Sequence, residues 1–378
     1  MDSEDDIMLK KFSVTNFKNF KDKVTIEFDK ASNYEFNDNV IKDGCVTKGI
    51  VYGINGSGKS NLGLAIFDII FSLTDKTKSF DKYIYYRNLD SPRKSVEFDY
   101  LFCFNGKEIE YLYEKTDVNT LKSEKLYIDG KEVLNYDFST KEGYTTLKGA
   151  ENLQFIPQLV MGIDTLSRVK YVRNNAILED NEENKAFIEF VNFVDKMLMF
   201  YSLKENRYQG FTIGSDSYTS GIIREGRLKD FEEFLKERGI NYNLISINAN
   251  GIPEIFCQYK KEAVPFMSVA STGTMSLALF YYWYIQLEKA SFVYIDEFDA
   301  FYHFELAQDI VEMVKKLENV QIILSTHNTD LISNDLLRPD AYYLIKNNVI
   351  KSFDKSTVKE LRRAHNLQKM FKAGAFDE

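Results

Sequence analysis

The sequence predicts an α/β fold in which a mixed β-sheet surrounds a glycine-rich loop, with an antiparallel β lobe and a helical insertion. Residues 53–60 have the pattern G-x-x-x-x-G-K-[ST], with an apolar strand before them and a helix after them. The pairs Asn105-Gly106 and Asp129-Gly130 each follow a segment of alternating polarity, which is typical of tight hairpins. Beyond about residue 261, short apolar runs alternate with segments of helical periodicity.

The same patterns predict the elements in chain order. Strands are expected at 8–17, 23–28, 45–52, 96–104, 108–113, 125–128, 291–295, 320–324 and 341–345, and helices at 61–70, 275–284, 306–317 and 355–372. Apolar residues also recur at helical spacing within 187–201 and 228–235. We therefore expect three parts: an N-terminal half with the loop and the β lobe (1–150), a mainly helical insertion (151–260) and a C-terminal half (261–378).

Composition limits the class of protein. The chain has 378 residues, 44% hydrophobic and 15% aromatic, which is enough for a globular protein with a sizeable core. The net charge of −9 argues against a protein coated in nucleic acid, although a local basic patch stays compatible with it. Cys45, Cys103 and Cys257 fit no metal-ligand spacing and indicate free thiols in a reducing compartment.

Neither end nor interior of the sequence suggests a membrane protein. Four of the first six residues are acidic, unlike those of a signal peptide. No apolar run reaches the roughly 18 residues that a membrane helix needs. We expect a cytoplasmic protein without membrane association.

The chemistry of the glycine-rich loop is that of phosphate binding. Glycines let successive backbone N–H groups point inward, and the helix that follows adds the positive end of its dipole. Lys59 would reach the β- and γ-phosphates, and the Ser60 hydroxyl would contact Mg²⁺. The alternative is a glycine-rich turn with a surface lysine. The candidate ligands for ATP are Gly53, Asn55, Gly56, Ser57, Gly58, Lys59, Ser60 and Asn61.

Asp296 and Glu297 close the expected strand 291–295. A buried strand that ends in two acids suits Mg²⁺-dependent hydrolysis, with Asp296 holding the metal through water or Ser60, and Glu297 acting as general base on the attacking water. The alternative is an acid pair at the surface end of a strand. His327 follows the next strand, 320–324, where it could reach a γ-phosphate or lie in an ordinary loop.

Ser271 and Gly273 precede the helix 275–284. A turn of small residues that opens a helix can bind an anion, or Ser271 can simply cap the helix. Ser271 lies before Asp296, and Glu297 lies before His327. This order and spacing resemble those of the ABC-type ATPases, which implies an ABC-type ATPase head. The segment 14–20, together with the loop, resembles the SMC/RecF branch of that family.

This resemblance implies a dimer. Ser271 and Gly273 would be the signature that covers a nucleotide bound to a second subunit, so the partner is a second copy in a homodimer or a higher even-numbered oligomer. Gln154 and Gln158 are candidates for the glutamine that contacts Mg²⁺ in ABC proteins.

Two features of the sequence differ from the SMC/RecF pattern and indicate a narrower family. SMC heads have an aspartate where this chain has His303, and a histidine there resembles the OLD-like ATPases and their abortive-infection relatives. The C-terminal segment 362–376 also looks like those short bacterial ATPases. Only about 50 residues follow His327, too few for the Toprim nuclease domain of full-length OLD proteins. The resemblance therefore implies that a nuclease or toxin is a separate protein, as in two-component phage-defence systems.

Three functions follow as hypotheses. The first is an ATPase that dimerises on ATP and regulates a separate effector in anti-phage defence. The second is a RecF-like DNA-repair clamp that binds nucleic acid directly. The third is an ATP-dependent scaffold that barely turns over. The basic C-terminal residues suit nucleic acid, an acidic partner or a solvated helix face: Lys355, Lys359, Arg362, Arg363, Lys369 and Lys372.

Overall fold

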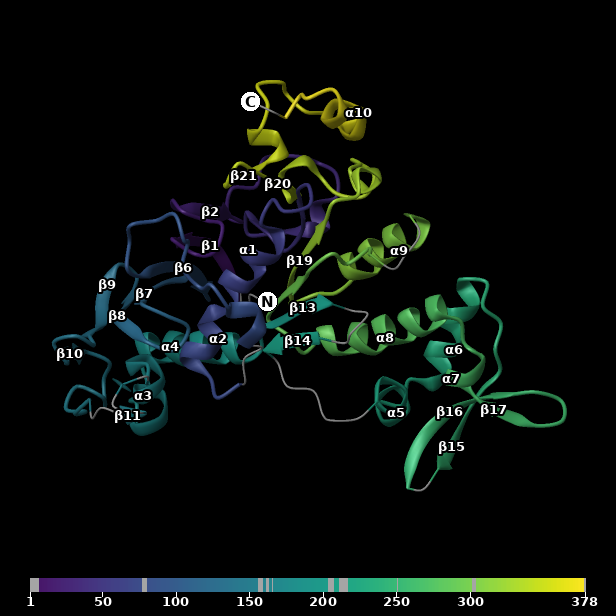
Figure 1. The fold of residues 1–378 in the computed structure, drawn as a ribbon, viewed down its shortest axis with the longest axis horizontal. Helices are drawn as coiled ribbons and strands as arrows, with labels where there is room; N and C mark the ends of the chain where they lie inside the picture. The colour runs from purple at the N-terminus through teal and green to yellow at the C-terminus, as the bar shows by residue number, and fades with distance from the viewer. Residues whose placement is uncertain are drawn as a thin grey trace.

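A central β-sheet lies between a β lobe and a group of helices in the computed structural model (Figure 1). The structure describes residues 7–76, 80–155, 159–160, 163–164, 166–202, 207–210, 217–249, 251–300 and 304–376. The C-terminal segment with α10 forms the top of the view, and the hairpin of β15 and β16 projects at the lower right.

The central sheet has seven strands in the order β14-β13-β18-β19-β5-β20-β21. The bounds are β14 Arg207–Gly210, β13 Leu198–Ser202, β18 Phe292–Ile295, β19 Gln321–Thr326, β5 Lys48–Tyr52, β20 Tyr342–Lys346 and β21 Val349–Ser352. The strands from β13 to β20 pair in parallel, whereas the edge strands β14 and β21 pair antiparallel. This confirms the predicted mixed sheet.

The β lobe is a second seven-stranded sheet, with the order β10-β9-β8-β7-β6-β1-β2 and antiparallel pairing throughout. The bounds are β1 Ile7–Thr15, β2 Val24–Glu27, β6 Val96–Phe104, β7 Lys107–Lys115, β8 Leu121–Ile128, β9 Lys131–Asp137 and β10 Glu142–Thr145. Asn105 (φ 51°) and Gly106 (φ 78°) connect β6 to β7. Both left-handed conformations belong to the tight hairpin turn that the sequence predicts.

Ten α-helices are present in the described residues. The bounds are α1 Lys59–Ile66, α2 Asp68–Leu73, α3 Arg168–Asn175, α4 Glu182–Asp195, α5 Tyr218–Arg224, α6 Leu228–Glu237, α7 Phe266–Val269, α8 Thr272–Leu287, α9 Phe304–Lys315 and α10 Leu367–Lys372. The remaining strands are β3 Ile41–Lys42, β4 Cys45–Val46, β11 Leu159–Val160, β12 Ile163–Asp164, β15 Leu244–Ala249, β16 Ile252–Gln258 and β17 Ala263–Pro265. Among the helices described, every one is too short or too polar to cross a bilayer.

The segment expected as a mainly helical insertion, 151–260, contributes to the central sheet. Helix α4 ends at Asp195, and the apolar residues after it form β13, which pairs in parallel with β18. A short apolar run fits a buried strand as well as a helix, so helical spacing alone extended the predicted helix too far. The strands β15, β16 and β17 form a separate antiparallel sheet in the same region and beyond it.

The C-terminal helix is also shorter than predicted. Instead of 355–372, α10 covers only Leu367–Lys372, because the side chain of Asn366 accepts a hydrogen bond from the Lys369 N–H and so caps the helix there. The chain before it is held by Asn334, whose Nδ2 lies 3.0 Å from the carbonyl oxygens of both Arg362 and His365.

A buried ion pair joins α2 to the β lobe. Asp68 and Lys115 have side chains that are 0% and 3% exposed, and Lys115 Nζ lies 2.7 Å from Asp68 Oδ1. The hydroxyl groups of Tyr113 and Tyr86 donate to the two oxygens of Asp68, at 3.0 Å and 2.8 Å. Since α2 follows α1 after one residue, this cluster attaches the helix of the glycine-rich loop to the lobe.

Replacing Lys115 with methionine should destabilise the fold. The change leaves the Asp68 carboxylate buried without its cation, which typically costs about 3–5 kcal/mol. Urea denaturation followed by circular dichroism would measure the loss. Lys122→Met is the matched control, because Lys122 pairs with Glu114 at a position where its side chain is 47% exposed. The control should lose less than about 1 kcal/mol, and equal losses from both variants would contradict a structural role for the buried pair.

Candidate functional site

The glycine-rich loop crosses from the carboxyl end of β5 to the start of α1. Gly56 (φ 81°) and Gly58 (φ 107°) adopt left-handed conformations that favour glycine. A Cβ at Gly58 would lie 2.6 Å from Asn19 Nδ2, whereas a Cβ at Gly56 would meet nothing within 4 Å. The loop is therefore tightly packed on its α1 side and open at Gly56, and Asn55 and Gly56 are both exposed.

Lys59 lies buried against the loop that it follows. Its Nζ donates to the carbonyl oxygen of Gly53 at 2.8 Å and approaches that of Ile54 at 3.4 Å. Burial lowers the pKa of the Lys59 ammonium, while Glu297 and the neighbouring acids oppose this shift. Ser57 Oγ is also buried and has no hydrogen-bond partner among the described residues. An ammonium group and an unpaired hydroxyl in one loop fit a phosphate ligand.

The first acid, Asp296, lies beside Ser60. Burial raises the pKa of the Asp296 carboxyl, and the hydroxyl groups of Ser325 and Ser60 oppose this shift. Oxygen donors of this kind suit Mg²⁺, which typically takes one or two carboxylates and completes its shell with water and substrate phosphates. No group of three or more His, Cys, Asp or Glu in the described residues could hold a metal by itself. The site therefore fits Mg²⁺ bound together with a phosphate ligand.

The second acid, Glu297, has an unusual backbone conformation. Its φ is 47°, in the left-handed region that residues other than glycine rarely adopt. Its N–H donates to Ser325 Oγ at 2.9 Å, and its carbonyl accepts from the Ala300 N–H at 3.1 Å. Glu297 Oε1 lies 4.0 Å from His327 Nδ1, and both side chains are about half exposed. The structure thus brings the two predicted catalytic residues together at the open side of the site.

Asn61 belongs to a network of three asparagines. Its Nδ2 donates to Asn19 Oδ1 at 2.7 Å, and Asn19 Nδ2 donates to Asn348 Oδ1 at 3.0 Å. Asn348 Nδ2 donates in turn to the backbone carbonyl of Asn19 at 3.1 Å. The network joins α1 to the loop between β1 and β2 and to the turn between β20 and β21.

Ser271 and Gly273 are not part of this cluster. Ser271 caps α8: its Oγ accepts from the Thr274 N–H at 3.2 Å, and both Ser271 and Gly273 are exposed. Figure 1 shows α8 running from its start beside α6 and α7 toward the central sheet, so Ser271 lies at the end of α8 that is remote from α1. Within one chain, Ser271 and the loop belong to separate surfaces.

Several contacts of the site were not predicted from the sequence. Ser325 bridges the two acids, and the Tyr294 hydroxyl donates to the Lys59 carbonyl at 2.8 Å. Asp299 is buried, lies close enough to Lys59 to affect its charge, and has a buried Oδ1 without a partner in the described residues. Asp299 could have been proposed from the sequence, because it follows the acid pair closely. Ser325 could not, because a serine inside an apolar strand has no distinctive pattern.

The remaining predicted residues are Gln154, Gln158 and His303. Gln154 is exposed, after the last strand of the lobe. Gln158 and His303 lie outside the residues that the structure describes.

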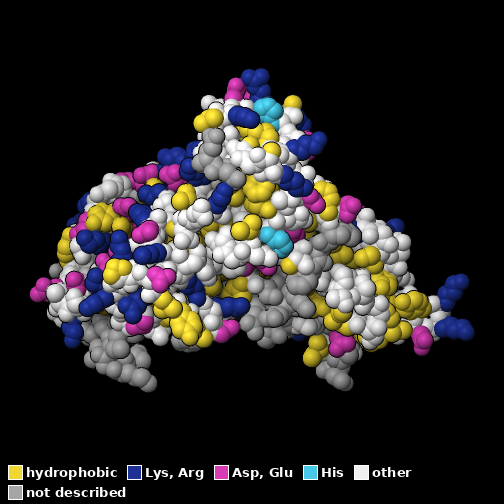
Figure 2. Space-filling view, turned by 45° about the horizontal axis from the view of Figure 1, so that its top comes forward, with side chains coloured by type: hydrophobic (Ala, Val, Ile, Leu, Met, Phe, Trp, Pro, Cys, Tyr) yellow, Lys and Arg dark blue, Asp and Glu magenta, His cyan; other side chains and the backbone are white. Residues whose placement is uncertain are grey.

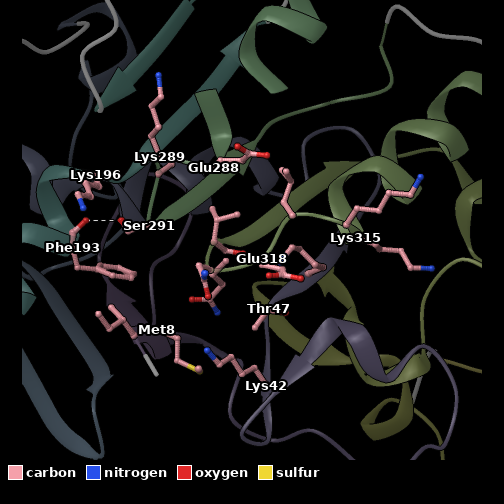
Figure 3. Close-up of a pocket in the computed structure, with 18 of the residues that line it drawn as sticks. Met8, Lys42, Thr47, Phe193, Lys196, Glu288, Lys289, Ser291, Lys315 and Glu318 are labelled. Carbon is pink, nitrogen blue, oxygen red and sulfur yellow. Dashed lines mark hydrogen bonds between the residues drawn. The ribbon is translucent and has the colours of Figure 1, made fainter. Parts of the chain in front are cut away.

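A cavity of about 1340 Å³ lies at the opposite edge of the central sheet, where β5, β18 and β19 begin (Figure 3). Lys196, Lys289 and Lys315 in its lining follow or end the helices α4, α8 and α9. Cations in these positions complement the negative ends of helix dipoles. The cavity is distant in the sheet from the loop and the acids, and we assign it no ligand.

Comparison with known proteins places the chain in a family. The family described as "AAA domain, putative AbiEii toxin, Type IV TA system" matches residues 50–333, about three quarters of the chain. No curated protein matches the chain.

Similar solved structures include the SMC head domain from Thermotoga maritima, with 16% identity over 91% of this chain and 98% of that chain, at a TM-score of 0.42. The Smc head domain bound to the C-terminal domain of ScpA derived from Pyrococcus furiosus has 14% identity over 92% and 97% of the two chains, at a TM-score of 0.45. The recombination mediator RecF with ATP has 16% identity over 92% and 100%, at a TM-score of 0.40.

Gly58→Ala should destabilise the protein without any ligand more than Gly56→Ala does. Both changes place alanine in a left-handed conformation, at a cost of about 1–2 kcal/mol. Only the Cβ at position 58 also collides with Asn19 Nδ2 and disturbs its bond to Asn348 Oδ1. Differential scanning calorimetry of the two variants would compare their Tm values. Equal Tm values would show that the asparagine network does not hold the loop.

Proposed function

We propose that this chain, which belongs to the AAA family whose match spans residues 50–333, binds ATP with Mg²⁺ in the loop 53–60 and hydrolyses it. The observation that carries this proposal is the convergence of Lys59, Asp296 and Glu297 at one edge of the central sheet. Lys59 is buried beside the loop carbonyls. Burial lowers the pKa of its ammonium group, and the negative charges of both acids oppose this shift. A cation in a phosphate-binding loop beside two acids is the arrangement that phosphoryl transfer to water requires.

Each residue has a distinct part in binding. When ATP binds, the Lys59 ammonium would replace its hydrogen bonds to the Gly53 and Ile54 carbonyls with hydrogen bonds to the β- and γ-phosphates. The inward N–H groups of the loop would contact the same phosphate oxygens. Ser60 and Asp296 would hold Mg²⁺, which supplies neutralisation of the phosphate charge when bound. Asn55 and Ser57 would add side-chain contacts to the phosphates.

Glu297 is the proposed general base. It would accept the proton of the attacking water, and His327, 4.0 Å away, would contact the γ-phosphate and orient that water. The left-handed backbone of Glu297 supports this assignment, because strained residues concentrate at functional sites.

A second copy would complete the site. The exposed N-terminus of α8, with Ser271 and Gly273, suits the γ-phosphate of a nucleotide held by a neighbouring chain, since a helix N-terminus favours anions. A symmetric pair would enclose two nucleotides, each between the loop of one chain and the signature of the other. ATP binding would hold the pair together, and hydrolysis would release it.

We propose control of a separate effector, a nuclease or toxin in anti-phage defence, as the purpose of this cycle. The toxin–antitoxin wording of the family description supports such a setting. The basic C-terminal residues are partly neutralised, as Arg362 lies 3.0 Å from Glu360 and Lys372 lies 3.9 Å from Asp330. Figure 2 shows Lys and Arg interspersed with Asp and Glu over the visible face. These features favour a protein partner.

Direct binding of nucleic acid, as in a RecF-like clamp, is the second candidate. The exposed Arg363 and Lys369 near the C-terminus favour it. Duplex DNA binding that weakens steeply with salt would support this candidate, whereas co-purification with an effector that survives high salt would support the first.

Lys59→Ala and Glu297→Gln should separate binding from hydrolysis. Lys59→Ala removes the cation that contacts the phosphates and should weaken ATP binding by more than about tenfold. Glu297→Gln keeps the shape of the side chain but removes the base, so it should bind ATP normally while kcat falls by about 10²–10⁴-fold. Fluorescent ATP titration and phosphate release would measure the two effects. Unchanged ATP affinity in Lys59→Ala would refute the assignment of the loop.

The shared site can be tested by mixing variants. Ser271→Arg should bind ATP yet fail to pair or hydrolyse, because a bulky cation would occupy the interface. In a mixed pair with Lys59→Ala, one site carries both changes and the other carries neither, so ATPase activity should partly reappear. Analytical ultracentrifugation would verify that mixed pairs form. Full activity of Ser271→Arg alone would contradict the signature assignment, as would inactive mixed pairs if one intact site suffices for turnover.

A further inference from the structure

We propose that Ser325 is a positioning residue of this site, whose single hydroxyl orients Asp296 for the metal and Glu297 for the attacking water. This inference rests on the proposed ATPase function and assigns a role to a residue outside the loop, the acid pair and the histidine. Ser325 lies in β19, two residues before His327, and is completely buried.

The bonds of Ser325 have a defined direction. Its Oγ donates to Asp296 Oδ1 at 2.6 Å, which uses its only proton. The backbone N–H of Glu297 can only donate, so Ser325 Oγ accepts from it at 2.9 Å. One side chain therefore contacts the carboxylate of Asp296 and the backbone of Glu297.

The bond to Glu297 matters because of its backbone. A left-handed conformation costs a residue with a side chain about 1–2 kcal/mol and persists only where the surroundings impose it. At Glu297, Ser325 supplies two of the restraints: its hydroxyl accepts from the Glu297 N–H, and its carbonyl accepts from the Phe298 N–H at 3.2 Å. Without the hydroxyl, the buried side of this turn loses one of its restraints, and the Glu297 carboxylate loses its fixed place beside His327.

The bond to Asp296 acts on the metal ligand. Ser325 holds Oδ1 from the side of β19, and Ser60, at the start of α1, lies near the same carboxylate. The bond from Ser325 thus orients the carboxylate before any ligand arrives. Hydrogen bonds to metal ligands of this kind typically change metal affinity or activity by about 10–100-fold when they are removed.

The test uses the full chain with Ser325→Ala, Ser325→Thr and a control, Ser291→Ala. Ser291 lies just before β18, at the opposite edge of the same sheet, where its Oγ donates to the Phe193 carbonyl at 2.6 Å. Ser325→Ala should lower kcat by about 10–100-fold with little change in KM, and should raise by about tenfold the Mg²⁺ concentration needed for half-maximal binding of a fluorescent ATP analogue. Ser325→Thr restores the hydroxyl and should recover most of both properties, and Ser291→Ala should match the parent.

The outcomes distinguish the two proposals. A parent that does not hydrolyse ATP refutes the proposed function, while the Mg²⁺ dependence of nucleotide binding still decides the role of Ser325. A parent that hydrolyses ATP, with Ser325→Ala unchanged in kcat and in Mg²⁺ dependence, refutes only the role of Ser325. Equal impairment of the Ala and Thr variants would also overturn it, because volume and not the hydroxyl would then matter. Should Ser325→Ala fail to fold, Ser325→Cys, which is slightly larger and offers only a weak donor, takes its place.

Discussion

The parallel pairing of β5, β18 and β19 is the constraint on which the candidate site depends. Thr326 lies opposite Tyr52, so β19 and β5 end at the same level, and β18 ends two residues earlier, at Ile295 opposite Leu324. The carboxyl ends of parallel strands share one edge of a sheet, where ligands commonly bind in α/β proteins. The glycine-rich loop, the acid pair and His327 meet because each follows one of these strands. The Tyr294 hydroxyl and the Lys59 carbonyl, 235 residues apart in sequence, are joined there.

Contacts on two sides hold the edge of the central sheet that carries the candidate site. The buried pair of Asp68 and Lys115 fixes α2 to the β lobe, and so fixes the helix that follows the loop. The ring of Tyr52, at the end of β5, lies 4.7 Å from that of Phe371 in α10. Gln368 also donates to Asp330, three residues after His327. The helix after the loop and the segment after His327 are therefore tied to the β lobe and to the C-terminal segment, respectively.

Local rules were sufficient for the parts of the fold that depend on neighbouring residues. The loop between a strand and a helix, the hairpin at Asn105 and the apolar strands of the central sheet could all be predicted, and the acids and His327 could be assigned to strand ends. Residues 198–202 could not be assigned, because a short apolar run is compatible with helix or strand until its partner, β18, is known. Asn19 and Asn348 meet across 329 positions, and no pattern in the sequence announces such a contact. The contacts of Ser325 could not be predicted for the same reason.

The exposure of the site within one chain supports the proposed pair. Lys59 and Asp296 are buried, whereas the side chains of Glu297 and His327 are 44% and 48% exposed. Under the proposed function, phosphates and a metal would be held by buried groups, whereas the reacting water would stay in contact with solvent, where electrostatic interactions are weak. Closure would require another surface that tolerates negative charge. The exposed N-terminus of α8 has that property, and it lies on a different surface from its own loop. A second copy would offer it to the first, and a symmetric pair would make the same contact at both sites.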